Sequence, residues 1–234
     1  MFISSPSSLM LTNFHGVCLA AAFSLEQFSD QDFHALNIAL PDNISRSVNK
    51  RKAEFLAGRY LAKLALSQLN RPEADIPSGD NRAPIWPVGI AGSISHHKTK
   101  AVCALTPAHS PEQGIGIDTE LFVCEKTIDA LLKTAVNRQE VEELAKAGLT
   151  EIAGLTAVFS AKESLFKALF PQVQRYFDFL DVRLVACNDK GFEFALNTTL
   201  ATGLPKNSRL NVDCYWEPDA VTTFTQSDWV ETPR

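Results

Sequence analysis

The pattern of apolar and polar positions predicts a long amphipathic helix in the first half of the chain. Residues Ser45–Leu69 carry apolar side chains at helical spacing, and Pro72 marks the end of the helix. The next segment, Arg71–Ile90, holds four prolines and two glycines, a composition typical of loops. Because a long ordered loop in a compact domain is often functional, Arg71–Ile90 is a candidate part of a binding site.

Two helices are predicted in the second half of the chain. The first covers Asn137–Ala147 and is stopped by Gly148. The second covers Glu151–Leu169, is capped by Thr150 and ends before Pro171. This second helix carries several charged residues among large apolar ones, so it is a candidate for more than structural support.

Strands are predicted after each long helix. Ala101–Leu105 and Ile115–Glu120 are short strand candidates, and Tyr176–Glu217 alternates as several strands do. The order of helix then strands occurs twice, which predicts an α+β protein made of two similarly built halves, each a small antiparallel sheet packed with a long helix. The polar turn Thr106–Gln113 is the predicted boundary, so the halves are expected at residues 1–110 and 111–234.

The composition is that of a globular protein with a modest net charge. The 234 residues are 45% hydrophobic and 21% charged, with a formal net charge of −5. This acidic balance argues against a nucleic-acid partner, since no basic stripe with interleaved aromatic residues is present. Any anionic ligand must therefore be held by local basic groups.

Cysteine usage and hydropathy bear on the compartment. The five cysteines are odd in number and form no Cys-x-x-Cys pair, which predicts free thiols in a reducing cytoplasm. No apolar run reaches the length of about 18 residues that a membrane helix needs. The mildly apolar stretch Met10–Phe23 lacks a basic leader, so no signal peptide is expected there.

Two carboxylates share one face of the strand Ile115–Glu120. Strand alternation places Gly114, Gly116, Asp118 and Glu120 on the same side. Glycines there would leave room for a bulky ligand, and paired carboxylates suit a hard cation such as Mg²⁺. The alternative is a solvated strand end with two unrelated acids.

The helix Glu151–Leu169 brings a third carboxylate. Glu163 shares a face with Phe159 and Phe166, so burial there demands a partner. Lys167, four residues on, could supply it as an intrahelical ion pair, which is the structural alternative to a catalytic role. Lys162 interrupts an apolar stripe, and the alternative to a ligand contact is a lysine that extends its ammonium to water.

Two segments of the first half could bind phosphate. Gly92–His97 combines glycine, small hydroxyls and histidines, which can donate several hydrogen bonds, although a lone histidine is often structural. Arg51 and Arg59 are eight residues apart, roughly 80° around a helix axis, with Gly58 allowing close approach. Taken alone, these arginines also fit a solvated helix face.

Together these segments resemble the 4'-phosphopantetheinyl transferases, specifically the larger, pseudo-dimeric class that includes the siderophore-synthase type. The resemblance spans about residues 46 to 180. One departure is Phe159, where the family often has tryptophan. The matching segments are Arg51–Arg59, Asn81–Pro87, Ser93–His96, Gly116–Glu120 and Phe159–Lys167.

The resemblance implies a metal site and a coenzyme A site. Asp118, Glu120 and Glu163 would coordinate Mg²⁺, or Mn²⁺, against the pyrophosphate of coenzyme A. The loop Asp80–Pro84 would lie near the adenine. The residues implied to contact the phosphates of coenzyme A are Arg51, Arg59, Arg82, Ser95, His96 and Lys162.

The resemblance also implies the reaction. The enzyme would transfer the 4'-phosphopantetheine arm of coenzyme A to a serine of an apo acyl or peptidyl carrier protein, releasing adenosine 3',5'-bisphosphate, and two fused halves suggest a monomer. Glu163 would act as base, directly or through a metal-bound water, and Lys167 would orient it or assist the leaving phosphate. The alternative is a non-catalytic module that binds coenzyme A or a carrier domain. Such a module would be expected to lose some of Asp118, Glu120, Glu163 and Lys167, but all four are present.

Overall fold

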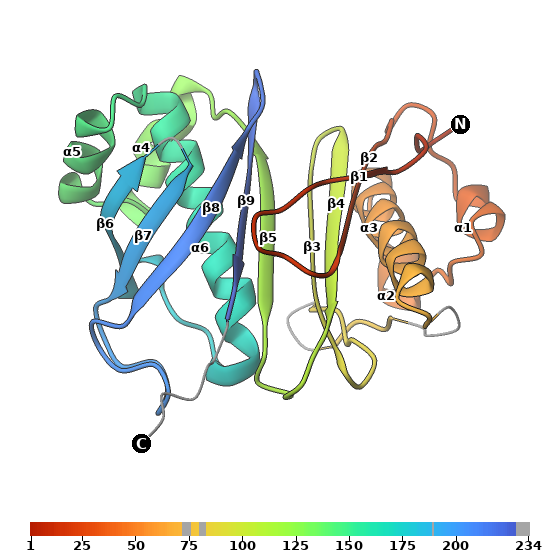
Figure 1. The fold of residues 1–234 in the computed structure, drawn as a ribbon. Helices are drawn as coiled ribbons and strands as arrows, with labels where there is room; N and C mark the ends of the chain where they lie inside the picture. Colours follow the sequence, from red (N-terminus) through yellow and green to blue (C-terminus); the bar gives the residue numbers. More distant parts are fainter. Residues whose placement is uncertain (72–75, 80–82, 189, 228–234) are drawn as a thin grey trace. The chain divides into compact units, whose positions relative to one another are not determined.

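The computed structural model describes residues 1–71, 76–79, 83–188 and 190–227. It divides into two compact units, Met1–His109 and Ser110–Arg234. Each unit holds one antiparallel sheet and its own helices (Figure 1), so the predicted α+β class is confirmed. None of the helices in these ranges is long and apolar enough to cross a membrane.

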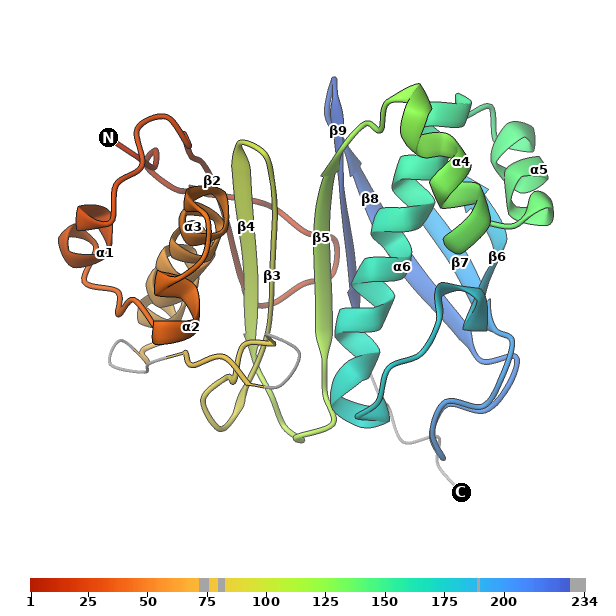
Figure 2. The ribbon, with the colours of Figure 1, turned by 180° about the vertical axis from the view of Figure 1, so that it is seen from behind.

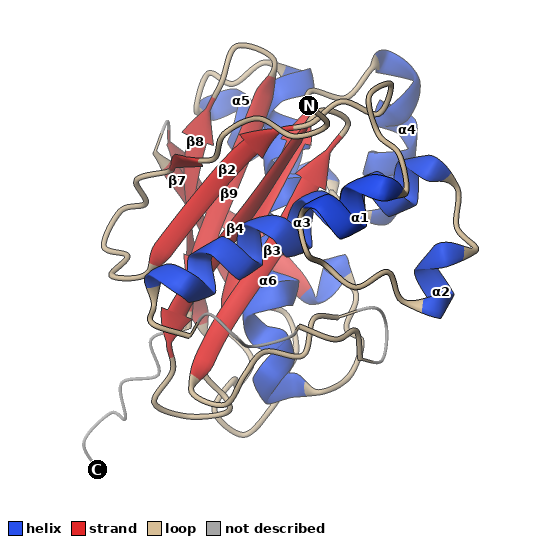
Figure 3. Ribbon diagram, turned by 90° about the vertical axis from the view of Figure 1, so that its right-hand side faces the viewer, coloured by secondary structure: helices blue, strands red, loops and turns tan. Residues whose placement is uncertain are grey.

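The first unit is a sheet of four strands in the order β1–β2–β4–β3. Helix α3 lies on one face of this sheet (Figure 3) and packs mainly against β4 and β2. The strands are β1 (Ser7–Ser8), β2 (Val17–Ala22), β3 (Ile90–His97) and β4 (Lys100–Pro107), and the helices are α1 (Gln31–Ala35), α2 (Asp42–Ser45) and α3 (Asn49–Gln68).

The core of the first unit forms between α3 and the sheet. Leu56, Leu61 and Leu66 of α3 are fully buried, as is Leu105 of β4. Burial of each such side chain contributes about 1.5–3 kcal/mol, so this contact fixes α3 on the sheet.

The second unit is a sheet of five strands in the order β5–β9–β8–β7–β6. Helix α6 covers one face (Figure 2) and packs against β5, β9 and β8. The strands are β5 (Ile115–Leu121), β6 (Val182–Asn188), β7 (Gly191–Leu196), β8 (Arg209–Trp216) and β9 (Ala220–Gln226), and the helices are α4 (Glu125–Thr134), α5 (Arg138–Lys146) and α6 (Glu151–Val173).

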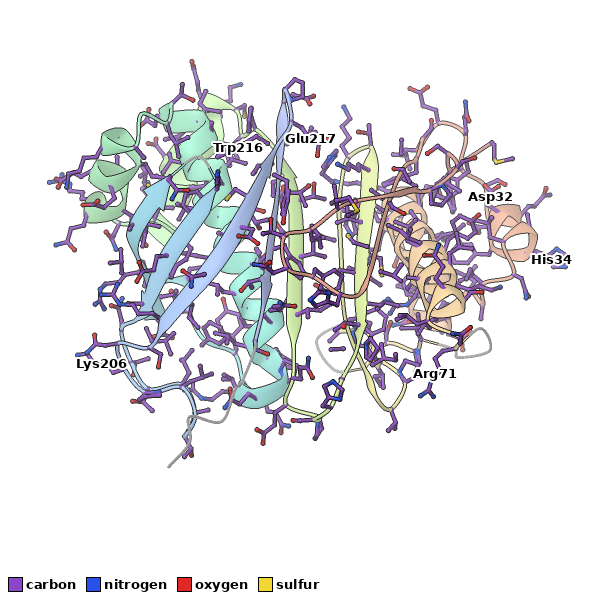
Figure 4. The ribbon with its side chains drawn as sticks, in the orientation of Figure 1. Asp32, His34, Arg71, Lys206, Trp216 and Glu217 are labelled. Carbon is purple, nitrogen blue, oxygen red and sulfur yellow. The ribbon has the colours of Figure 1, made fainter. Side chains whose placement is uncertain are left out.

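The turns of the second sheet lie at its two ends. Figure 4 shows Trp216 and Glu217 where β8 turns into β9, and Lys206 in the longer connection between β7 and β8. The ring of Trp216 lies 6.4 Å from that of Phe122, which follows β5 directly. The aromatic pair therefore covers the end of the strand that carries the two candidate carboxylates.

Several predicted elements are confirmed with small changes. Thr150 caps α6, accepting a hydrogen bond from the Ala153 N–H at 3.4 Å, and α5 and β5 lie where they were expected. The prediction that α6 ends before Pro171 is wrong, because the helix continues to Val173. Pro171 lies in the last turn of α6, where its missing N–H removes a single backbone hydrogen bond.

The long first helix is shorter than predicted, and some elements were missed. The chain forms α2 and then begins α3 only at Asn49, after Val48 in an extended conformation. The missed elements include α1, α4, β1, β2, β9 and the strand β3, which contains the glycine, serines and histidines of Gly92–His97. These residues have low strand propensity, and pairing with β4 on one side places them in the sheet.

Candidate functional site

The glycines of β5 bring the strand into contact with the backbone of α6. A Cβ atom on Gly116 would lie 1.8 Å from the carbonyl oxygen of Ser164, and one on Gly114 would lie 2.0 Å from that of Ala168. The prediction that these glycines leave room for a bulky ligand is therefore wrong. Their space is filled by the helix, and the close approach brings the carboxylates of β5 next to the charged residues of α6.

Asp118 and Lys167 form an ion pair across this contact. The Lys167 ammonium lies 2.7 Å from Oδ1 of Asp118 and donates a second hydrogen bond to the carbonyl oxygen of Ile117 at 3.1 Å. The carboxylate is 4% exposed, whereas the lysine side chain is 26% exposed. A cation that is partly open to solvent thus holds a buried carboxylate in one orientation.

Glu120 and Glu163 complete a cluster of charges with Asp118 and Lys167. Burial, followed by the negative charge of Asp118, raises the pKa of Glu120 to about 8, and Glu163 acts in the same direction. Burial also raises the pKa of Glu163, with a further contribution from Asp118, while Lys167 lowers it. The carboxylates are therefore close enough for Asp118 to repel both Glu120 and Glu163.

This acidic cluster, Asp118, Glu120 and Glu163, has the donors that a hard divalent cation prefers, namely carboxylate oxygens in a partly buried setting. In the described ranges, no three His, Cys, Asp or Glu side chains converge closely enough to hold an ion in their present conformations. A cation near these carboxylates would favour their charged forms, which burial and then the charge of Asp118 disfavour in Glu120 and Glu163.

Lys162 lies apart from this cluster. Its side chain is fully buried, and its ammonium lies 2.7 Å from Oε1 of Glu140 and donates to the carbonyl oxygen of Ala135 at 2.8 Å. Glu140 also accepts hydrogen bonds from the backbone N–H groups of Asn137 and Leu184, both at 2.8 Å. This placement does not favour the phosphate contact expected for Lys162, and it equally excludes the alternative of an ammonium that reaches water.

The first unit presents basic groups on and near α3. Arg59 is 8% exposed, donates from Nη2 to the Ser78 hydroxyl at 3.2 Å and lies 4.8 Å from the centre of the Phe55 ring. Its Nε is buried and has no hydrogen-bond partner in the part of the chain that the structure describes. Burial, with a smaller contribution from the charge of Arg51, lowers the pKa of Arg59 to about 10. A buried guanidinium beside a second cation is a favourable place for an anion.

His96 faces α3. Its Nδ1 lies 3.8 Å from Oε1 of Glu54, and one turn further along α3 a Cβ on Gly58 would lie 2.7 Å from Ile94. The close approach predicted at Gly58 is thus made by a side chain of β3. Ser95 is on the opposite face of the strand from His96, because successive residues alternate, so the two are not presented to a ligand from the same side.

The remaining predicted residues lie in the Pro-rich loop. Arg82, with Asp80 and Asn81, lies outside the described residues. On either side of them, the Gly79 N–H donates to the Ala83 carbonyl at 2.8 Å. The same loop supplies the Ser78 hydroxyl that accepts a hydrogen bond from Arg59.

Sequence reasoning missed Glu54 and Glu140, the carboxylate partners of two predicted ligand-binding residues. Glu140 stands three residues after Asn137, the spacing of a capping box, which both side chains form at the start of α5. Neither pairing could be read from spacing, because each partner lies more than 20 residues away in the sequence.

Comparison with known proteins gives matches in both units. Residues 40–106 match a family model described as the 4'-phosphopantetheinyl transferase N-terminal domain, and residues 114–216 match that of the 4'-phosphopantetheinyl transferase superfamily. The chain is 36% identical over 169 residues to enterobactin synthase component D of Escherichia coli, covering 71% of this chain and 76% of that protein.

Two further relatives are similar at lower identity. The chain is 32% identical over 142 residues to the 4'-phosphopantetheinyl transferase Npt of Nocardia iowensis, covering 60% of this chain and 62% of that protein. It is 32% identical over 148 residues to the 4'-phosphopantetheinyl transferase PptT of Mycobacterium tuberculosis, covering 60% of this chain and 61% of that protein. The matched regions include both the acidic cluster and the basic helix α3.

Proposed function

Because the chain belongs to the 4'-phosphopantetheinyl transferase superfamily, we propose that Asp118, Glu120 and Glu163 hold a divalent cation, Mg²⁺ or Mn²⁺, against the pyrophosphate of coenzyme A. The enzyme transfers the 4'-phosphopantetheine arm of coenzyme A to a serine of an apo carrier protein and releases adenosine 3',5'-bisphosphate. Coenzyme A and the carrier protein are thus its partners. A module that only binds them is not favoured, since the relatives are named transferases.

The observation that carries the cation site is the repulsion within the acidic cluster. Burial raises the pKa values of Glu120 and Glu163, the negative charge of Asp118 raises them further, and the Lys167 ammonium pairs with Asp118. When bound, the cation would neutralise charge on the pyrophosphate. The cluster has the donor type, the burial and the excess negative charge that such a group needs.

The protein's own groups have distinct roles in this proposal. Lys167 fixes the orientation of Asp118 through the 2.7 Å ion pair, and its partly exposed ammonium is available to a ligand phosphate. Glu163 removes the proton from the carrier serine, since its carboxylate lies within electrostatic reach of both Asp118 and Lys167.

The phosphates of coenzyme A are bound by Arg51, Arg59 and His96. Arg59 supports this role most strongly, since its guanidinium is buried and its Nε lacks a partner among the described residues. His96 contributes a donor beside Glu54, whose Oε1 lies 3.8 Å from its Nδ1. Ser95, Arg82 and Lys162 are not assigned here, for the reasons of placement given above.

The enzyme works as a monomer in the cytoplasm. Each unit has its own hydrophobic core. One chain therefore contains both halves, and no second copy is needed to supply one of them. All five cysteines are free, and Cys124 is exposed, as expected for a reducing compartment.

The test of the proposed function is the mass of a carrier protein after incubation. An apo acyl carrier protein of fatty-acid synthesis and an apo peptidyl carrier domain are each incubated with coenzyme A, Mg²⁺ and the enzyme. At least one carrier is expected to become heavier by one phosphopantetheine arm, and EDTA is expected to prevent this. Asp118→Asn and Glu163→Gln should each slow transfer by about 100-fold or more.

The matched control is Asp213→Asn, which changes a partly buried carboxyl on β8 outside the acidic cluster. It should leave transfer within about two-fold of the wild type. Transfer that is unchanged by EDTA and by Asp118→Asn would exclude the proposed cation site, even if the carrier is modified.

A further inference from the structure

Three buried hydroxyls join α6 to β9 in the core of the second unit. The Thr223 hydroxyl lies 2.9 Å from that of Ser160 and 2.8 Å from that of Ser164. Ser164 also donates to the carbonyl oxygen of Thr223 at 3.1 Å. All three residues are fully buried. We call Ser160, Ser164 and Thr223 the hydroxyl cluster.

The hydroxyl cluster is adjacent to the acidic cluster on both β9 and α6. Thr223 is the register partner of Asp118 on the neighbouring strand, so the two side chains point to the same face of the sheet, toward α6. Ser164 follows Glu163 in the helix and precedes Lys167 by three residues, and its carbonyl oxygen fills the space above Gly116. The hydroxyl cluster thus connects the elements that carry the charged groups.

Apolar packing alone would not hold these groups in one arrangement. Apolar contacts have little directional preference, so a helix on a sheet can rotate or slide with only a small change in buried area. Hydrogen bonds between buried hydroxyls depend on distance and angle, and a buried hydroxyl that loses its partner is left without the hydrogen bond that water would have supplied. A shift of α6 along β9 would break three of them.

We propose that Thr223 is a positioning residue for the reaction: its hydroxyl fixes α6, through Ser160 and Ser164, so that Glu163 and Lys167 meet Asp118 in the geometry that binds the cation. This inference rests on the proposed cation site. It predicts that removing the Thr223 hydroxyl weakens cation binding. The loss of affinity should exceed what the accompanying change in the stability of the folded protein accounts for.

The next residue in β9 provides a matched control. Thr222 is 1% exposed, and its hydroxyl lies 2.9 Å from that of Thr119 on the opposite face of the same two strands. Thr222→Val and Thr223→Val therefore each remove one buried hydroxyl from the same strand with little change in side-chain shape. Only the second substitution acts on α6.

The test is Mn²⁺ binding to the complex of the full chain with coenzyme A, followed by electron paramagnetic resonance, with thermal unfolding measured in parallel. Thr223→Val is expected to raise the Kd for Mn²⁺ about 10-fold, the usual effect of losing a group that orients a metal ligand. Thr222→Val should change it by less than about two-fold, and Thr223→Ser, which keeps the hydroxyl, should restore wild-type binding. If Thr223→Val does not fold, Ser160→Ala takes its place with the same expected direction.

Equal weakening by Thr223→Val and Thr222→Val, or no weakening by either, overturns the positioning role. Asp118→Asn separates this result from the proposed function. If the wild type binds Mn²⁺ and Asp118→Asn does not, the cation site stands and only the inference about Thr223 fails. If the wild type and Asp118→Asn bind Mn²⁺ equally, the cation site and the inference fail together.

Discussion

The Lys167 ammonium lies 2.7 Å from Oδ1 of Asp118 and 3.1 Å from the carbonyl oxygen of Ile117, joining the middle of β5 to the second half of α6. The pair crosses the contact that Gly114 and Gly116 make possible. It therefore depends on the packing of two backbones, and it fixes the carboxylate at the centre of the acidic cluster.

Replacing Lys167 by methionine is expected to damage both folding and transfer. The change leaves Asp118 buried without its counter-charge, which should lower the free energy of unfolding by about 1–3 kcal/mol, and turnover should fall by about 100-fold. Urea unfolding and the rate of carrier modification measure the two effects. Lys146→Met is the control, because Lys146 pairs with Glu143 in an exposed position and should change neither quantity appreciably.

The pH dependence of stability should reveal the repulsion in the acidic cluster. The folded-state pKa of Glu120 is raised from 4.5 to about 8, chiefly by burial and then by Asp118, so the folded protein holds this proton more tightly than the unfolded chain. Its stabilising contribution is complete below pH 4.5 and is lost as the pH rises toward 8. In EDTA the Tm should fall over this range, and Mg²⁺ should raise it more at pH 8 than at pH 5.

Glu120→Gln is the matching variant for the pH experiment. It should flatten the decline in Tm between pH 5 and 8, because the amide does not titrate. A decline as steep as that of the wild type would mean that other groups cause the pH dependence.

Arg59 and Lys162, both expected from the sequence to bind phosphate, should behave differently. Arg59→Met should weaken coenzyme A binding about 10-fold, because it removes a buried guanidinium whose Nε has no hydrogen-bond partner among the described residues and is proposed to bind a phosphate. Lys162→Met should leave the affinity of the folded protein unchanged and lower its stability by about 3–5 kcal/mol, because Glu140 stays buried without a counter-charge. Calorimetric titration and urea unfolding separate these outcomes, and a loss of affinity with Lys162→Met would restore the phosphate role.

The contact between β5 and α6 can be tested with a single methyl group. In Gly116→Ala the added Cβ would lie 1.8 Å from the Ser164 carbonyl oxygen, so helix and strand must move apart. We expect a loss of about 1–3 kcal/mol in the free energy of unfolding and weaker Mn²⁺ binding. In the control Gly154→Ala, the new Cβ would lie 3.3 Å from the Leu144 side chain, so a shift of a few tenths of an ångström accommodates it and stability should change by less than about 1 kcal/mol.

Local patterns in the sequence predicted much of the fold. Alternation in Ile115–Glu120 gave the strand and the shared face of Asp118 and Glu120, and Thr150 gave the start of α6. The same reasoning missed β3, because a strand of glycine, serine and histidine is stabilised by its pairing with β4 and has little propensity of its own. Pro171 was interpreted as the end of the helix, although a proline in the last turn removes only one backbone hydrogen bond.

The candidate site was harder to predict, because its charges find partners that are distant in sequence. The structural alternative for Lys167 was an ion pair with Glu163 in the same helix, whereas its ammonium pairs with Asp118 at a separation of 49 residues. Lys162 finds Glu140 in another helix. The glycines of β5 were interpreted as space for a ligand, since the sequence does not reveal whether a ligand or a helix fills such a space.

The proposed cation site is tested most directly by anomalous X-ray diffraction from crystals of the enzyme grown with Mn²⁺ and coenzyme A. The account predicts one manganese peak within bonding distance of carboxylate oxygens of Asp118, Glu120 and Glu163 and of the coenzyme A pyrophosphate. A manganese peak away from these carboxylates, or bound coenzyme A with no manganese between it and the acidic cluster, would contradict it.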